Sequence, residues 1–204
     1  MAKPDLRLLL SAAFAVAITA APAGAFGLLP SDLLLGAGNS FATTGDPNGG
    51  GASLRAVPQW RVTDKLKFGI EFFADDIGTE IVDVVDPADG ISRGAVAQTH
   101  RWVYGGAWRA DGELLSRGRW KSGVSGSWGY WRVEDDIRGR TQGAFSGIGF
   151  GASANIRRVV SRAQDLGMSV GYTRVFADRR AAVQRVDRYA YAALEWRWAI
   201  AERP

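Results

Sequence analysis

Beyond residue 30 the chain alternates between apolar residues and small or charged residues, in segments of about ten residues. The clearest is the segment 52–62, whose apolar face carries Ala52, Leu54, Ala56, Pro58, Trp60 and Val62. Its other face carries Ser53, Arg55, Val57, Gln59 and Arg61. A period of two predicts a β-strand with one face toward an apolar environment. A second alternating run from Leu66 follows the short Thr63-Asp64 connection, so the two runs predict a hairpin.

The same test finds six further alternating segments, which brings the prediction to eight strands. They cover about 33–41, 91–110, 119–133, 147–157, 166–173 and 189–198. The strand from Leu66 can be followed to Val85, beyond the roughly 9 to 11 residues of a tilted membrane crossing. We therefore expect a hairpin that projects well beyond the membrane around the Pro87-Ala88-Asp89-Gly90 turn. Pro58 cannot donate to a ladder of hydrogen bonds, and it predicts a local bulge.

The placement of glycine indicates which face is inside. Gly106 and Gly126 share the apolar row, whereas the opposite face carries Gly36, Gly38, Gly69, Gly105, Gly123, Gly129, Gly147, Gly149, Gly151, Gly167 and Gly171. The lumen of an eight-stranded barrel is only wide enough for side chains, so small residues belong inside. The pattern predicts an all-β fold, an eight-stranded antiparallel up-and-down transmembrane β-barrel. A soluble lipocalin-like carrier, with the apolar row lining a cavity, is the alternative.

Aromatic residues of the apolar row fall at two predicted heights, as is typical of a membrane-water interface. We expect Trp60, Phe68, Trp108, Trp120 and Trp198 near the short-turn end. A looser second belt toward the loops is expected to contain Trp128, Tyr130 and Tyr172.

The N-terminus has the features of an export signal. Lys3 and Arg7 precede the apolar run Leu8 to Ala21, and Ala23-Gly24-Ala25 fits signal-peptidase cleavage. We predict a signal peptide over 1–25 and a barrel domain over 26–204. The chain has no cysteine, which excludes a disulfide framework and any thiolate site.

In this pattern, the segment from about 28 to 200 resembles the small outer-membrane barrels of Gram-negative bacteria, of the OmpA transmembrane domain, OmpX and OmpW types. The resemblance implies a location in the bacterial outer membrane, contact with its lipid and lipopolysaccharide, and insertion by the barrel-assembly machinery. It also implies an envelope-structural, surface-interaction or small-solute role. Those families end on an aromatic strand residue. Here Trp196 and Trp198 fit that alternation, but Ala199 to Pro204 follow.

Ionic residues on the predicted inner face are candidates for a lumen network. They are Arg55, Arg61, Lys67, Arg101, Lys121 and Arg197, with Glu71 and Glu195 as the acids. Buried charges must be paired and hydrogen-bonded, so we expect an ion-pair plug.

Two further charged groups lie in the predicted outer loops. The projecting hairpin carries Asp75, Asp76, Glu80, Asp83, Asp86 and Asp89, which we interpret as solvated acids because their spacing matches no calcium loop. The final loop carries Arg179, Arg180, Arg185 and Arg188. These arginines are candidates for contact with lipopolysaccharide phosphates.

His100, the single histidine, is predicted on the outward face near the outer-leaflet headgroups. Some similar barrels are lipid A deacylases or acyltransferases, in which a histidine acts with a serine and an acid. Because no nucleophile neighbours His100 in the sequence, we predict no catalytic residue and no enzyme, and keep the lipid-modifying enzyme as an alternative. No motif indicates a cofactor, a metal or nucleic acid as a ligand.

Overall fold

The computed structural model describes residues 29–43, 50–85, 92–137, 140–177 and 188–200. The predicted signal peptide and the Pro87 to Gly90 turn lie outside these ranges. The eight strands are β1 (Asp32–Ala42), β2 (Gly51–Arg61), β3 (Leu66–Val85), β4 (Ser92–Arg117), β5 (Trp120–Ile137), β6 (Arg140–Val159), β7 (Gln164–Ala177) and β8 (Arg188–Ala199). Within the described ranges, no helix is long and apolar enough to cross a membrane.

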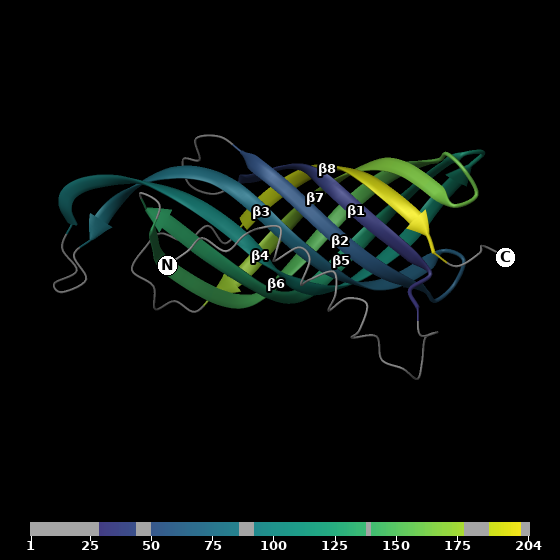
Figure 1. Ribbon diagram of the computed structural model, residues 1–204, viewed down its shortest axis with the longest axis horizontal. Coiled ribbons are helices and arrows are strands. Elements are labelled where there is room, and N and C mark those ends of the chain that lie inside the picture. Colours follow the sequence, from purple (N-terminus) through teal and green to yellow (C-terminus); the bar gives the residue numbers. More distant parts are fainter. Residues whose placement is uncertain (1–28, 44–49, 86–91, 138–139, 178–187, 201–204) are drawn as a thin grey trace.

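Each strand pairs antiparallel with the next, and β8 pairs with β1, so the sheet closes into an up-and-down barrel (Figure 1). The predicted fold class is therefore confirmed. The β3–β4 hairpin extends past the other strands, at the left of Figure 1, as its strand lengths predicted.

The stagger of the strands sets their tilt. Following the printed pairings from Ala42 through β8, β7, β6, β5, β4, β3 and β2 leads back to β1 at Asp32, ten residues earlier (42 − 32). With ordinary strand spacing, a stagger of ten residues over eight strands tilts each strand by roughly 40° from the barrel axis. Residues at equal distances from a turn can therefore lie at different heights on different strands.

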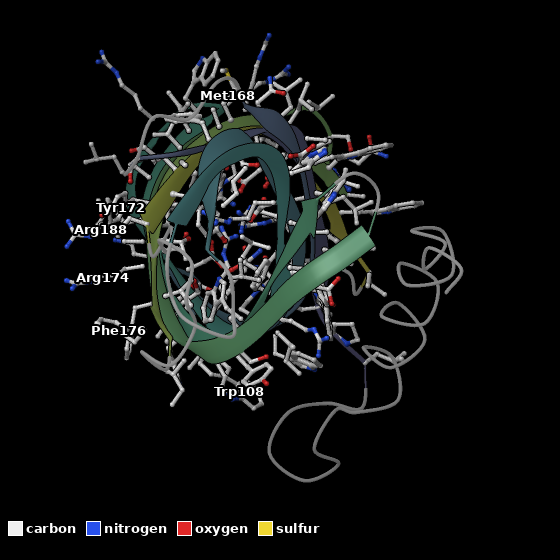
Figure 2. All side chains as sticks on the ribbon, turned by 90° about the vertical axis from the view of Figure 1, so that its left-hand side faces the viewer. Trp108, Met168, Tyr172, Arg174, Phe176 and Arg188 are labelled. Atoms are coloured by element: carbon white, nitrogen blue, oxygen red, sulfur yellow. The ribbon has the colours of Figure 1, made fainter. Side chains whose placement is uncertain are left out.

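The two faces of the wall differ as predicted. Leu194 and Ile148 point outward with 61% and 62% of their surface exposed, whereas the neighbouring Glu195 is 1% exposed. Met168, Tyr172 and Phe176 also point away from the axis (Figure 2). An apolar exterior around a charged interior is the reverse of a lipocalin-like carrier, so that alternative is wrong.

Pro58 lies opposite Leu33 of β1 in regular register. Toward β3, the register on either side of it is unchanged, with Ala56 opposite Phe72 and Gln59 opposite Gly69. The predicted bulge is therefore wrong. Because no residue is inserted, Pro58 removes one donor from the ladder and leaves the register unchanged.

Candidate functional site

The turn-side half of the lumen contains an ionic cluster centred on Arg109 of β4. Its guanidinium lies 3.3 Å from Glu71, 3.0 Å from Asp111 and 3.5 Å from Glu195. Arg55 of β2 extends the cluster by an ion pair of 2.7 Å to Glu71. All five side chains are almost fully buried, so each charge depends on its neighbours for stabilisation.

From Arg109 the network continues along the lumen toward the short turns. The Gln59 amide donates to Asp111 at 2.6 Å, and Arg197 lies 3.9 Å from the same carboxylate. Lys67 pairs with the fully buried Asp32 at 2.8 Å. The network thus links residues from β1, β2, β3, β4 and β8.

The remaining predicted lumen residues lie at the edges of this network. Lys121 pairs with Glu113 at 3.2 Å, with side chains 28% and 14% exposed. Arg101 is buried in the loop-side part of β4, and Arg61 is half-buried at the end of β2.

Asp75 corrects one expectation. We expected a solvated loop acid, but its side chain is fully buried, 2.8 Å from Arg55, and it accepts a hydrogen bond from Ser53 at 2.6 Å. The reason is that β3 is still inside the barrel at this position, opposite Ser53 of β2.

Several charged residues of the lumen were not predicted, although strict alternation along each strand places them on the inner face. Two acids and six cations were predicted for the lumen, but the buried lumen carboxylates are Asp32, Glu71, Asp75, Asp111, Asp165 and Glu195. The buried arginines are Arg55, Arg101, Arg109, Arg157 and Arg197. With Lys67, which pairs with Asp32, six cations balance six acids among these described residues. Continuing the alternation to the strand ends indicates the missed acids, since Asp32 and Asp165 share the parity of Gly36 and Gly167.

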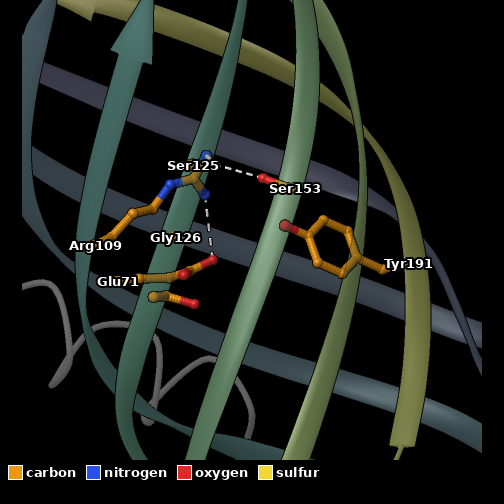
Figure 3. Close-up of a pocket in the computed structure, with 7 residues that line it drawn as sticks. Glu71, Arg109, Ser125, Gly126, Ser153 and Tyr191 are labelled. Atoms are coloured by element: carbon orange, nitrogen blue, oxygen red, sulfur yellow. Dashed lines mark hydrogen bonds and ion pairs between the residues drawn. The ribbon is translucent and has the colours of Figure 1, made fainter.

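A small cavity lies beside Arg109 (Figure 3). Its volume is about 10 Å³, and its lining includes Glu71, Arg109, Ser125, Ser153 and Tyr191. That volume is about the minimum for one water molecule. Arg109 also donates to Ser125 at 3.1 Å, so the cavity is part of the ionic network.

The loop-side half of the lumen is filled mainly by apolar side chains, although Asp75 and Arg101 are also buried there. Its buried cluster consists of Ala42, Phe73, Ile77, Val103, Ala107, Trp131, Val133, Val175 and Tyr189. Trp131 is 1% exposed, packs on Phe73 with ring centroids 5.1 Å apart, and donates to the Tyr189 hydroxyl at 3.3 Å. This apolar layer was not among the predictions made from the sequence. The alternation gives the face of a residue but not its height.

Glycine makes room for these rings. A Cβ at Gly149 would lie 2.8 Å from the Trp131 ring, and one at Gly171 would lie 2.3 Å from the Tyr191 ring. Tyr191 connects the two halves, because the Arg55 guanidinium stacks 3.4 Å from its ring centroid. Small residues in the wall therefore permit large ones in the lumen.

The exterior aromatic residues only partly follow the predicted belts. Trp60 is opposite Phe68 near the turns, and Trp198 and Trp120 lie at strand ends on the same side. Trp108 and Trp128, assigned to opposite belts, are direct partners on β4 and β5, so that assignment is wrong. Strand tilt and the extra length of β4 explain the error. Tyr130 and Tyr172 lie nearer the loops, opposite Ile148 and Ala190 respectively.

His100 lies on the exterior of β4 beyond the apolar band. Its Nε2 is 2.7 Å from Oδ1 of Asp76, its ring stacks on Trp102 at 5.5 Å, and its side chain is 44% exposed. The same Asp76 oxygen accepts the Gly78 amide at 3.0 Å, and Gly78 has a left-handed φ of 91°. Among the side chains that the structure describes, no hydroxyl is hydrogen-bonded to His100, and no group of three or more potential metal ligands occurs among the described residues.

Of the four predicted lipopolysaccharide contacts, only Arg188 lies in the described ranges. It begins β8 opposite Arg174 of β7, and both side chains point away from the barrel (Figure 2). Arg179, Arg180 and Arg185 lie outside those ranges, as do Asp86 and Asp89 of the hairpin.

No protein-family model and no curated protein matches this chain. Among solved structures, the Neisserial surface protein A (NspA) matches with a TM-score of 0.62 and 15% identity, over 83% of this chain and 96% of that protein. A major outer membrane protein from Thermus thermophilus matches with a TM-score of 0.54 and 10% identity, over 82% and 98% respectively. At such identities the likeness concerns the fold. This chain has the fold of the small eight-stranded bacterial outer-membrane β-barrels.

Proposed function

We propose that this protein is an integral barrel of the bacterial outer membrane that acts through its surfaces, in an envelope-structural or surface-interaction role, and not as an open pore. The observation that carries the proposal is the two-part filling of the lumen. An ionic half around Arg109 and an apolar half around Trp131 follow each other along the axis.

The exterior supports membrane insertion. Exposed leucine, isoleucine, valine and phenylalanine side chains on β1, β6, β7 and β8 would leave a large apolar area in water. Barrels of this class present an apolar band about 25 Å tall to the hydrocarbon.

The filled lumen argues against a role in passing small solutes. A charged solute would have to cross the apolar cluster, and an apolar solute would have to cross the paired charges. The cavity of about 10 Å³ beside Arg109 does not provide a path between them. A small-solute role would therefore require movement of lumen side chains.

Three further features belong to the same proposal. Residues 1–25 direct export, and N-terminal sequencing of the membrane-purified protein should begin at Phe26.

The outward Arg188, beside Arg174, contacts lipopolysaccharide phosphate together with Arg179, Arg180 and Arg185. Insertion depends on the barrel-assembly machinery, which would read the final strand with Trp196 and Trp198.

The proposal is tested by fractionation and gel migration. The protein should sediment with outer membranes, and an unheated sample should migrate differently from a heated one. Recovery of native protein from osmotic-shock fluid would refute it.

One observation favours a second candidate, a lipid-modifying enzyme. The hydrogen bond between His100 and Asp76 supplies the base and the orienting acid of a hydrolytic site at the outer rim. Mass spectrometry of lipid A should compare cells without the protein, with the native protein and with His100→Ala. A lipid A modification present only with the native protein would establish the enzyme. Unmodified lipid A in all three would remove this candidate.

A further inference from the structure

An arginine-tryptophan-arginine row crosses three strands at the short-turn end of the exterior. Trp120 of β5 is opposite Arg117 of β4 on one side and opposite Arg158 of β6 on the other. Direct partners in antiparallel strands project to the same face, so the three side chains lie side by side. The Arg158 guanidinium stands 5.9 Å from the Trp120 ring centroid.

The backbone holds this row in place. Gly118 and Arg119 form the tight turn between β4 and β5, and Gly118 has a φ of 59°, a conformation that favours glycine. The Arg119 carbonyl accepts a hydrogen bond of 2.8 Å from the Val159 amide. This bond ties the turn to the end of β6, next to Arg158.

The row belongs to a basic end of the molecule. Exposed cations among the described turn-side residues are Lys65, Arg117, Arg119, Arg158 and Arg162, and the exposed acid there is Asp64. Glu113 and Lys121 are paired with each other in the lumen mouth. The short turns therefore present a net positive charge.

Apolar side chains continue the row. Leu115 is 71% exposed on the same face of β4, and Leu166 of β7 is the direct partner of Arg158. Trp196 follows opposite Leu166. The two arginines thus lie at the edge of the lipid-facing band. A soluble anion could contact the arginines but would leave the adjoining apolar side chains without a partner.

We propose that Arg117, Trp120 and Arg158 form a binding site for the headgroup of an anionic phospholipid in the inner leaflet. The arginines donate charge-assisted hydrogen bonds to the phosphate, Trp120 lies at the glycerol level, and Leu115 and Leu166 contact the acyl chains. The proposal rests on the membrane insertion proposed above. Charge complementarity and continuity with the apolar band favour a lipid over a soluble anion.

The test is native mass spectrometry of protein purified from outer membranes, with equal amounts of phosphatidylglycerol and phosphatidylcholine. The native protein should retain phosphatidylglycerol preferentially. The double variant R117Q/R158Q should lower that preference about thirtyfold, a change of about 2 kcal/mol, because each arginine near an anionic surface contributes about 1 kcal/mol to lipid binding. The matched control K65Q/R162Q removes the same charge from the same end, outside the row, and should keep the preference.

Three results would overturn the site: no preference in the native protein, an unchanged preference in R117Q/R158Q, or equal losses in both double variants, which would indicate diffuse charge. Binding to peptidoglycan sacculi that depends on the row, without phosphatidylglycerol preference, would assign it to a cell-wall ligand and also overturn it. Heat-modifiable migration of each variant verifies folding. Absence of the native protein from membranes would instead refute the proposed function.

Discussion

The two halves of the lumen fill the same space with opposite chemistry. On the turn side, Arg109 contacts three carboxylates, and removing any partner would leave a buried charge uncompensated. On the loop side, Trp131 fills its space by packing, and Gly149 is small enough to admit the ring. The difference shows that the lumen of an eight-stranded barrel can be filled either by paired charges or by closely packed apolar side chains. Substitutions should therefore destabilise the two halves for different reasons.

The largest expected effect is at the centre of the ionic half. Arg109→Ala leaves Glu71, Asp111 and Glu195 without their shared cation, which should lower the free energy of unfolding by about 3 to 5 kcal/mol. Urea unfolding in phospholipid vesicles measures it. Arg132→Ala, at an exposed arginine paired with Glu134, is the control and should change stability by about 0 to 1 kcal/mol. Equal effects of the two variants would contradict the ionic half.

A comparable or slightly smaller loss is expected at the centre of the apolar half. Trp131→Ala removes a fully buried ring and should cost about 3 to 4 kcal/mol. Trp131→Phe keeps most of the ring volume but loses the hydrogen bond to Tyr189, so the loss should be smaller. If alanine and phenylalanine were equivalent in the same urea measurement, packing would not be what stabilises this half.

Overpacking provides an intermediate effect. Gly149→Ala places a methyl group 2.8 Å from the Trp131 ring and should cost about 1 to 3 kcal/mol. Gly126→Ala is the matched control, because its added methyl group would meet nothing within 4 Å on the lipid-facing side. Thermal unfolding followed by gel migration compares them, and a control as destabilised as Gly149→Ala would refute the assignment of faces.

The smallest effect is expected at the lumen mouth. Lys121→Gln breaks a pair whose side chains are 28% and 14% exposed, so solvent screening should limit the loss to about 0 to 1 kcal/mol. Urea titration at low and high salt checks this. A loss as large as that of Arg109→Ala would extend the buried network to the mouth.

The sequence predicted the barrel because its signal is local. A period of two places Leu54 and Arg55 on opposite faces whatever their partners are, and eight such segments leave little choice of topology. The ionic partners were harder to identify. Arg109 and Asp111 lie in a strand of uneven alternation, and Asp75 was assigned to a loop because the end of the barrel on β3 could not be located.

The alternation of each strand predicts which face a residue lies on, but not its height along the barrel axis. Trp108 and Trp128 were placed at opposite rims although they are direct neighbours, and Trp131 and Val133 share the lumen parity of Gly129 without indicating that they form an apolar layer. The stagger of ten residues determines these heights, and it follows from pairings between strands that are distant in sequence.

The most direct test of the closed lumen is conductance across a planar lipid bilayer. With the native protein inserted, as verified by its unheated gel migration, no steady current steps are expected in concentrated potassium chloride, because the lumen charges are paired and the apolar cluster excludes ions. Reproducible ohmic steps from the native protein would show a continuous aqueous path through the lumen and refute the closed lumen.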